Sequence, residues 1–407
     1  MTTVLHFADL HLGIETHGRV DPSTGFSTRY SDVLSRLDEI VDYALSSGID
    51  LAIFAGDAFK NSRPSPTYLK DFASRIRRLS SEMPVLLLIG NHDIPRTLNR
   101  AASIDIFSAL DVPNVIVGSQ PGSRLIETKS GPVHLAWMPY PLRERLLTGE
   151  RLQSRIEDLD TELRQMVHVI LEDLRLKAEA WENAPRILAA HLAVAGADPG
   201  TDLPMFLGRD VYASLSDLTR TWDYVALGHY HRHQILNIDP PVVYSGSPER
   251  VSFGEGDDIK GFVVARVERG TAEIHFRPTK ARPFVTYDID LRPYSDPTQD
   301  LIDNLRKNDL GGVVLRLRLV LNAEQQASFS EIQVQRDLEE RGVSYVLIIK
   351  DVRAQSRLRL EEESIATMSP QDLVRHYFAT RGLEDARLEQ HVQLASQIMS
   401  EVHHDSA

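Results

Sequence analysis

Five short, mostly apolar runs divide the first 230 residues of the chain, and each stops abruptly at polar or turn residues. They cover residues 4–7, 51–54, 85–89, 186–190 and 224–227. Runs of this kind, without alternation of polar and apolar positions, are typical of strands that are buried on both faces. The pattern therefore predicts a sheet whose strands run mainly parallel and whose faces are covered by helices.

The segments between the first runs show helical spacing of their apolar positions. Residues 33–45 place these positions on one face of a helix that Asp32 can cap and Gly48 ends. Further helices are expected after Pro64 or Pro66 up to residue 78, and over about residues 151–180. Strand, loop, helix and strand in succession predict an α/β protein.

The pattern changes after residue 231. Apolar runs at 242–244, 261–265 and 272–276 are separated by turns that contain glycine, and they predict antiparallel strands. These strands would complete a two-sheet sandwich flanked by helices. We therefore predict that residues 1–280 form the first domain.

The remainder of the chain predicts a second, smaller domain and a terminal pair of helices. Residues 281–352 form a small α/β domain, with strands at about 284–291, 312–321 and 343–350 and helices at about 297–308 and 323–341. Residues 353–368 are charged and poorly patterned, as in a linker. Residues 369–407 predict two short amphipathic helices, which either bind a partner or pack back on their own domain.

Composition is that of a globular protein, with 42% hydrophobic and 25% charged residues. The chain has no cysteine, which excludes disulfides and thiolate metal ligands. It shows neither a signal sequence nor an apolar stretch of membrane-spanning length, so we expect a cytoplasmic location and no membrane. The net charge of −13 predicts weak affinity for DNA alone, because such affinity normally depends on lysine and arginine.

Metal-binding side chains follow directly after each of the five runs. They are Asp9 with His11, Asp57, Asn91 with His92 and Asp93, His191, and His229 with His231. Because the carboxyl ends of parallel strands meet at one edge of a sheet, these groups are expected to converge. Carboxylate, amide and imidazole groups without thiolates suit manganese, iron, zinc or a mixed pair of divalent ions.

Each motif has an ordinary structural alternative when taken alone. Gly56-Asp57 is a common turn, and a single histidine such as His191 is more often a hydrogen-bonded loop residue. Their joint occurrence makes this alternative improbable. Histidines without such neighbours are interpreted as structural or solvated: His6, His17, His134, His168 and His275. His233 is interpreted as a neighbour of the site or a surface residue.

The motifs Asp9-Leu10-His11, Gly56-Asp57, Gly90-Asn91-His92-Asp93 and Gly228-His229-Tyr230-His231 resemble those of calcineurin-like metallophosphoesterases in order and separation. The resemblance implies two metal ions, with manganese favoured and magnesium, iron and zinc as alternatives. One ion would be held by Asp9, His11, Asp57 and His231, and the other by Asp57, Asn91, His191 and His229. His92 would approach the phosphate, and Asp93 would orient His92.

The segments at residues 5–13, 55–59 and 246–255 also resemble nuclease subunits of the SbcD type. This resemblance implies double-strand DNA exonuclease and single-strand DNA endonuclease activity in DNA repair and recombination. It further implies a homodimer, residues 281–352 as a capping domain, and binding of an SbcC-type ATPase by the C-terminal helices. Lys60 departs from the pattern, since many relatives have histidine or aspartate there.

Two other interpretations are weighed against this one. The first is a related phosphodiesterase or phosphatase that acts on nucleotides or phosphoproteins without an SbcC partner. The second is a scaffold that keeps the fold and has lost catalysis, which is disfavoured because every ligand of the motif is present.

Overall fold

The computed structural model describes residues 1–95, 100–142, 156–200, 211–353, 368–379 and 385–404. The chain divides into two compact units, of which the first contains residues 1–287, 308–317 and 335–347, and the second contains residues 288–307, 318–334 and 348–407. The division at residues 280, 352 and 368 stays a prediction, and residues 354–367 of the expected linker lie outside the described residues.

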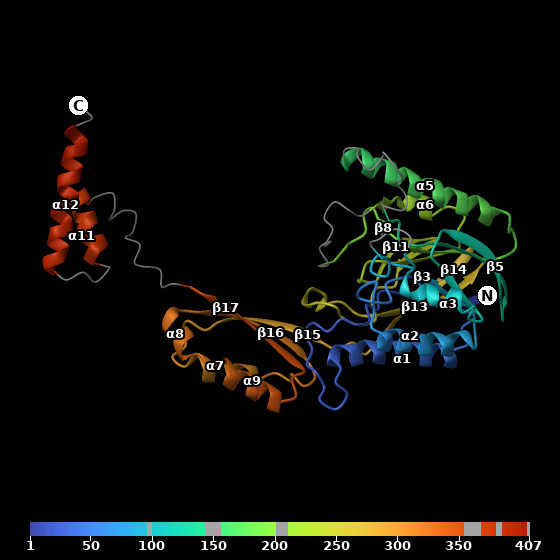
Figure 1. The fold of residues 1–407 in the computed structure, drawn as a ribbon, viewed down its shortest axis with the longest axis horizontal. Helices are drawn as coiled ribbons and strands as arrows, with labels where there is room; N and C mark the ends of the chain where they lie inside the picture. The colour runs from blue at the N-terminus through green and yellow to red at the C-terminus, as the bar shows by residue number, and fades with distance from the viewer. Residues whose placement is uncertain (96–99, 143–155, 201–210, 354–367, 380–384, 405–407) are drawn as a thin grey trace. The chain divides into compact units, whose positions relative to one another are not determined.

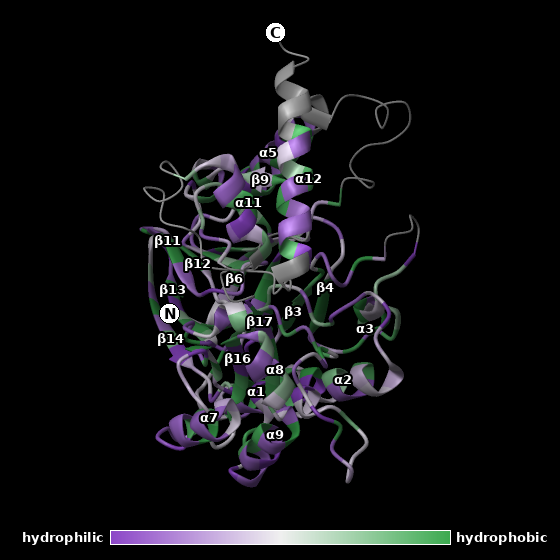
Figure 2. Ribbon diagram, turned by 90° about the vertical axis from the view of Figure 1, so that its left-hand side faces the viewer, coloured by the Kyte–Doolittle hydropathy of each residue, from purple (hydrophilic) through white to green (hydrophobic). Residues whose placement is uncertain are grey.

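The first six-stranded sheet contains the N-terminal strand in its interior. Its order is β14 (Thr271–Pro278), β13 (Gly261–Glu268), β1 (Thr2–Phe7), β2 (Leu51–Phe54), β3 (Val85–Leu88) and β4 (Val115–Gly118). Strands β1 to β4 are parallel, whereas β13 pairs antiparallel with both β1 and β14. The predicted runs at 51–54 and 85–89 are thus confirmed as buried parallel strands, with β3 ending one residue earlier than its run, and β3 is apolar throughout (Figure 2).

The second sheet has the order β11 (Gln234–Ile238), β12 (Pro241–Tyr244), β10 (Tyr224–Gly228), β7 (Arg186–His191), β6 (Gly131–Met138) and β5 (Gly122–Thr128). Strands β6, β7, β10 and β12 are parallel to their neighbours among these four. The predicted antiparallel strand at residues 242–244 is β12, which in addition pairs in parallel with β10. β12 is antiparallel to β11 through a tight turn, which reverses the chain and leaves β12 parallel to β10.

The two sheets face one another, and helices cover their outer faces (Figure 1). Apolar side chains from both sheets, such as Val4, Ile53, Ile187 and Ala226, fill the space between them. Helices α1 (Thr28–Ser46) and α2 (Pro66–Ser80) pack on the first sheet, and α5 (Ile156–Glu179) with α6 (Leu215–Leu218) packs on the second. The predicted α/β fold with a two-sheet sandwich is confirmed.

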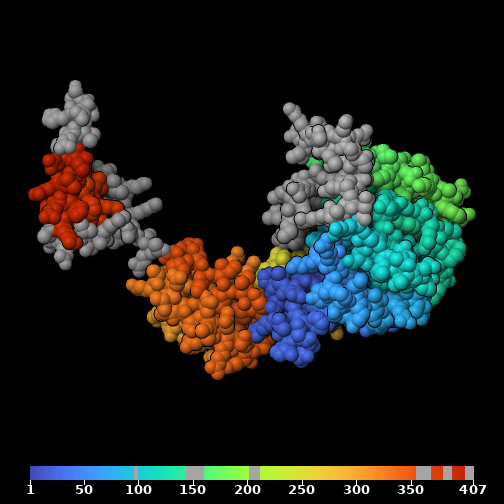
Figure 3. Space-filling model, in the orientation of Figure 1, coloured from blue at the N-terminus to red at the C-terminus, as the bar shows by residue number. Residues whose placement is uncertain are grey.

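Helix α1 begins earlier in the chain than predicted. Ser27, not Asp32, caps it by accepting a hydrogen bond from the Arg29 N–H at 3.2 Å. The first turn of α1 was not predicted because it contains the polar residue Arg29. This side chain is nevertheless buried, and it forms an ion pair with Asp32 at 2.7 Å. Helices α1 and α2 form one continuous surface in the space-filling view (Figure 3).

Shorter elements connect the strands. They are the helix α3 (Ile106–Ala109), the 3-10 turns η1 (Ser103–Asp105) and η3 (Phe253–Glu255), and a two-stranded sheet of β8 (Ala193–Val194) and β9 (Tyr212–Ala213).

A third sheet contains the strands of the predicted small α/β domain. Its order is β15 (Phe284–Asp290), β16 (Val314–Leu321) and β17 (Tyr345–Val352), with helices α7 (Pro297–Leu305), α8 (Ala323–Ser328) and α9 (Glu331–Glu340). The single helix predicted over residues 323–341 is interrupted. Phe329 adopts an extended conformation with ψ of 123°, which ends α8 before α9 begins.

The two C-terminal helices that the sequence predicts are α11 (Pro370–Ala379) and α12 (Asp385–His404), and they pack against one another. Arg375 pairs with Glu389 at 2.7 Å, and the Phe378 and His391 rings lie 5.0 Å apart. Hydrophilic and apolar residues alternate along α12 (Figure 2). No helix within the described ranges combines the length and the apolar character needed to cross a bilayer.

A buried histidine links the two sheets and predicts acid sensitivity. The His6 Nε2 donates to the Leu227 carbonyl at 3.1 Å, and the Tyr224 hydroxyl donates to His6 Nδ1 at 2.8 Å. Burial lowers the pKa of His6 to about 3 from its usual 6.5. Between these values the unfolded chain holds one more proton than the folded chain, so folding stability falls as the pH falls below 6.5.

We expect His6→Gln to remove this pH dependence, because glutamine can keep both hydrogen bonds without titrating. Between pH 6 and pH 5, the wild type should lose about 1.2 kcal/mol more unfolding free energy than the variant. Urea denaturation of metal-free protein at the two pH values measures the difference. Identical losses in the two proteins would show that His6 is not the group responsible.

Candidate metal centre

All seven predicted ligands lie at the carboxyl ends of parallel strands from both sheets. Asp9 and His11 follow β1, Asp57 follows β2, and Asn91 follows β3. His191 ends β7, and His229 and His231 follow β10. The structure brings these residues together although Asp9 and His229 are 220 positions apart in the chain.

One group of ligands brings together Asp9, His11 and His231. The Nε2 atoms of His11 and His231 face one another at 2.9 Å, and the His11 Nε2 lies 3.7 Å from Asp57 Oδ2. Ligand atoms of Asp9, His11 and His231 lie within 4.8 Å of one another. Lone pairs that converge in this way can be satisfied by a shared cation.

A second group meets at Asn91. The Asn91 Oδ1 atom lies 2.9 Å from His191 Nε2 and 3.0 Å from His229 Nδ1. The His191 Nε2 atom is 3.6 Å from Asp57 Oδ2, the same oxygen that faces His11. Asp57 therefore lies between the two groups, where one carboxylate can contact two cations.

Four of the ligands occupy backbone conformations that non-glycine residues rarely adopt. The φ angles are 55° at Asp9, 47° at His11, 60° at Asp57 and 113° at His229. Such strain persists only where surrounding contacts hold it, and it concentrates at functional sites. Here the Asp9 N–H donates to the Gly56 carbonyl at 2.9 Å, and the His229 N–H donates to the Asp9 carboxylate at 3.2 Å.

The prediction that Asp93 orients His92 was wrong. The Asp93 carboxylate accepts hydrogen bonds at 2.9–3.2 Å from four backbone N–H groups: those of Asp57, Ala58, Phe59 and Gly90. The His92 Nδ1 instead donates to the Lys60 carbonyl at 2.9 Å. Asp93 thus fixes the loop of Asp57, and the backbone of Lys60 orients His92.

His92 borders the site without belonging to either predicted ligand set. Its backbone N–H donates to Asp57 Oδ1 at 2.8 Å, and its ring lies edge-on to His11 with centroids 4.7 Å apart. Ligand atoms of His11, Asp57 and His92 also lie within 4.8 Å of one another.

Burial and the neighbouring side chains shift the pKa values of the ionisable ligands. Burial raises the pKa of Asp9 to about 6. Burial alone would also raise the pKa of Asp57, but the nearby imidazoles hold it well below its usual range. Burial alone would lower the pKa of His191, but the carboxylates of Asp57 and Asp9 raise it to about 9. Burial and adjacent imidazoles hold the pKa of His11 well below its ordinary value.

Two divalent ions fit this donor set. The oxygen and nitrogen donors are of the types that manganese, iron and zinc accept, and two buried carboxylates provide charge that cations neutralise. Tight packing fixes the arrangement, since a Cβ atom added at Gly90 would lie 2.1 Å from Asp57 Oδ1. A side chain at this position would displace the carboxylate between the two groups.

Two residues that the sequence motifs did not assign to the site also contact it. The Tyr140 ring lies 5.7 Å from the His229 ring, and Glu255 Oε1 lies 3.0 Å from His231 Nδ1. Tyr140 follows an ordinary strand and carries no motif. Glu255 stands within one of the segments that resemble SbcD-type nucleases, so that resemblance was the available signal.

Three of the histidines outside the motifs lie in local contacts. His168 pairs with Asp217 at 2.9 Å, His134 stacks on Trp181, and His233 stacks on Phe276 with centroids 4.1 Å apart.

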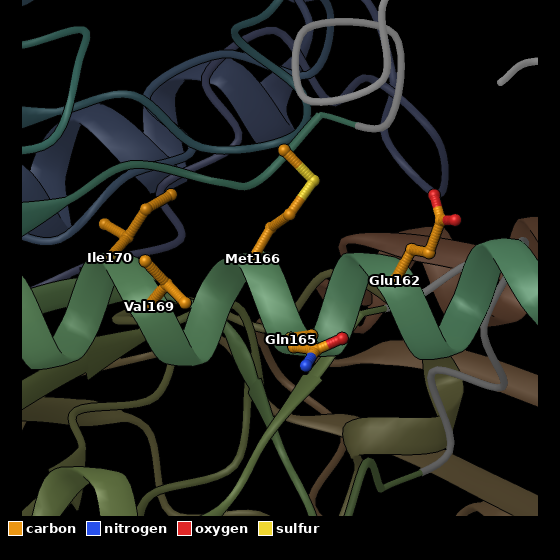
Figure 4. Close-up of a pocket in the computed structure, with 5 residues that line it drawn as sticks. All are labelled: Glu162, Gln165, Met166, Val169 and Ile170. Carbon is orange, nitrogen blue, oxygen red and sulfur yellow. The ribbon is translucent and has the colours of Figure 1, made fainter. Parts of the chain in front are cut away.

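A pocket of about 440 Å³ beside α5 is separate from these ligands. Its lining among the described residues consists of Glu162, Gln165, Met166, Val169 and Ile170 (Figure 4). These residues offer one carboxylate and no imidazole, so we do not assign the pocket to the metal centre.

The fold and the site define a metal-dependent phosphoesterase. The chain belongs to the calcineurin-like phosphoesterase family, whose model matches residues 2–233 and whose members use a binuclear metal centre. The expected relationship to this family is therefore confirmed.

Named relatives include DNA repair proteins and nucleases. The DNA double-strand break repair protein Mre11 of Thermoplasma acidophilum is 24% identical over 75% of this chain and 73% of its own length. The SbcD component of the nuclease SbcCD of Bacillus subtilis is 27% identical over 66% of this chain and 66% of its own length, so the chain spans just under two thirds of it. A dimetal phosphatase structure from Danio rerio is 14% identical, covers 67% of this chain and 98% of its own, and has a TM-score of 0.42.

Proposed function

We propose that this protein is a metal-dependent DNA nuclease with double-strand exonuclease and single-strand endonuclease activity. The observation that supports it best is the position of Asp57 between two groups of imidazole and amide ligands. Two-metal sites of this kind favour in-line displacement at a phosphodiester. The choice of DNA as substrate is supported by the relatives, which are named as SbcCD and Mre11 proteins.

Asp9, His11, Asp57 and His231 would hold one ion, and Asp57, Asn91, His191 and His229 the other. Bound ions, with manganese favoured, would supply Lewis-acid activation of the phosphodiester and of the attacking water. The His92 Nδ1–H is committed to the Lys60 carbonyl, which leaves Nε2 to face the phosphate. In the imidazolium form, which carries a proton on both nitrogens, the Nε2–H would contact the phosphate or protonate the leaving oxygen. Asp93 would act by positioning Asp57.

The basic side chains of the first unit differ in whether a carboxylate already pairs with them. Several of the basic residues that could favour DNA are already paired, since Arg75 contacts Asp38 at 2.8 Å and Arg78 contacts Asp42 at 2.6 Å. Lys60 and Arg63 instead line a pocket of about 330 Å³ next to the His92 loop. We infer that these two residues receive the phosphate backbone, and that a partner supplements weak DNA affinity.

The proposed complex is of the SbcCD type, in the cytoplasm, with an SbcC-type ATPase bound by the C-terminal helices and with a homodimer of this chain. Exposed apolar side chains on these helices support this assignment, since Tyr377, Leu394 and Ile398 are 49%, 57% and 53% exposed. Apolar anchors of this size commonly dominate a helical interface.

We expect Leu394→Glu to weaken binding of the ATPase by about tenfold or more, because it places a charge in the apolar contact. Gln393→Glu adds the same charge at an adjacent exposed position and should bind as the wild type does. Titration calorimetry with the purified ATPase measures both affinities. Equal affinity of wild type and Leu394→Glu would remove α12 from the interface.

The proposed function is tested by manganese-dependent cleavage of an end-labelled DNA duplex and a single-stranded DNA circle. Wild type is compared with His92→Ala, with and without the SbcC-type ATPase and ATP. Cleavage by the wild type that is lost in the variant would support the nuclease. Intact DNA together with rapid hydrolysis of bis-p-nitrophenyl phosphate would instead identify a phosphodiesterase with another substrate.

A further inference from the structure

A buried lysine–glutamate ion pair lies directly behind one predicted metal ligand. The side chains of Lys260 and Glu255 are 0% and 2% exposed, and the Lys260 Nζ contacts Glu255 Oε2. Burial of two charges is unfavourable unless each receives further hydrogen bonds, so their surroundings indicate what the pair does. Neither residue has a part in the proposed hydrolysis.

Glu255 uses both carboxylate oxygens. Its Oε1 accepts from His231 Nδ1 at 3.0 Å, and its Oε2 accepts from the Val251 N–H at 3.1 Å as well as from Lys260. With the His231 proton held on Nδ1, the Nε2 lone pair points toward His11 Nε2 at 2.9 Å. A carboxylate behind a ligating histidine fixes its tautomer and increases its basicity.

Lys260 holds the same histidine from a second direction. Its Nζ donates to the His231 backbone carbonyl at 3.1 Å and lies 3.5 Å from Asp258 Oδ2. Lys260 is itself anchored, because it immediately precedes β13 and its carbonyl accepts from the Thr279 N–H at 2.9 Å. One lysine thus fixes both the backbone of residue 231 and the carboxylate that contacts its ring.

The two predicted ion positions differ in this respect. The His191 Nδ1 donates to the neutral carbonyl of Ala55 at 2.7 Å, whereas the His231 Nδ1 meets a carboxylate. A charged acceptor forms a stronger hydrogen bond than a neutral one. His231 is therefore held by a stronger contact behind its ring than His191 is.

We propose that Glu255 and Lys260 are a positioning pair for His231, and that they raise the affinity of the ion position formed by Asp9, His11, Asp57 and His231. The inference rests on the proposed two-metal function. It concerns metal affinity, which can be measured without any substrate.

The test uses the charge-neutral double variant Glu255→Gln with Lys260→Met, which leaves no unpaired buried charge. Calorimetric titration with Mn²⁺ alone should give two ions per chain for the wild type. In the variant one ion should bind as in the wild type, and the other should bind about 10- to 100-fold more weakly. Electron paramagnetic resonance at one Mn²⁺ per chain reports whether isolated ions replace coupled pairs.

A second double variant, Asp223→Asn with Arg269→Met, provides the matched control. It removes another ion pair of the same unit, at 2.7 Å, whose side chains are 2% and 38% exposed. This control should bind two Mn²⁺ ions with wild-type affinity, which would separate loss of an ion pair from loss of this particular one.

The outcomes distinguish the inference from the function on which it rests. Wild-type binding of both ions by the Glu255/Lys260 variant would overturn the positioning role, as would equal weakening of both ions in a folded variant judged by circular dichroism. A wild-type protein that binds fewer than two Mn²⁺ ions would overturn the two-metal function itself.

Discussion

Replacement of Asp57 by asparagine is expected to abolish binding of the metal pair and to lower hydrolysis on the order of 10⁴-fold or more, since the ions supply most of the chemistry. Asparagine has the shape of aspartate and can still accept the His92 N–H, which bonds Asp57 Oδ1 at 2.8 Å. It places an NH₂ group where Asp57 Oδ2 faces His11 and His191 at 3.7 and 3.6 Å. An amide nitrogen with two protons cannot ligate either ion.

Metal content after dialysis, measured by inductively coupled plasma mass spectrometry, gives the first readout and turnover of a small phosphodiester gives the second. Asp217→Asn is the matched control, because Asp217 also pairs with a histidine, His168, at 2.9 Å but lies away from the site. The control should keep two ions. Two tightly bound ions in Asp57→Asn would show that this carboxylate is not the bridge.

His92→Ala is expected to keep both ions while lowering turnover by about 10²- to 10⁴-fold, the usual contribution of a positioned acid or base. The reason is geometric. The ring is held through Nδ1 by the Lys60 carbonyl at 2.9 Å, outside the two ligand sets, and its loss leaves Asp57 and His11 in place. The KM for a small phosphodiester should change less than kcat, because the contact strengthens in the transition state.

Equilibrium dialysis with Mn²⁺ and steady-state kinetics measure the two quantities on the same preparation. His168→Ala, which removes a surface histidine, should leave both unchanged. Loss of both ions in His92→Ala would identify His92 as a ligand, and the proposed division of roles would have to be abandoned.

The parts of the fold that follow from local composition were predictable. The runs that became β2, β3 and β10 are apolar at nearly every position, and a strand buried on both faces requires that composition. The convergence of Asp57, Asn91 and His229 was predictable for the same reason, because parallel strands bring their carboxyl ends to one edge.

The features that depend on distant residues were not predictable. Helix α1 can start at the Ser27 cap because Arg29, in its first turn, is buried with two carboxylate partners. These are Asp32 and Glu249, and Glu249 is far away in the chain. Nothing in the motif itself indicates that Asp93 accepts from the loop of Asp57 rather than from His92. Side-chain hydrogen bonds between loops depend on how the strands beneath them pack. The spacing of residues in the sequence does not specify that packing.

The position of β1 inside its sheet has a consequence for biosynthesis. One edge of β1 pairs with β2, and the other pairs with β13, where Thr2 lies opposite Val267. At usual translation rates, roughly 13 to 50 s separate the synthesis of these two strands. Residues 229 and 231 are also made late, so a nascent chain carries Asp9, His11 and Asp57 long before any cation site can be complete. We therefore expect ribosome-bound fragments that end before residue 231 to be inert toward phosphodiesters, so that hydrolytic capacity arises only when the first domain is almost fully synthesised.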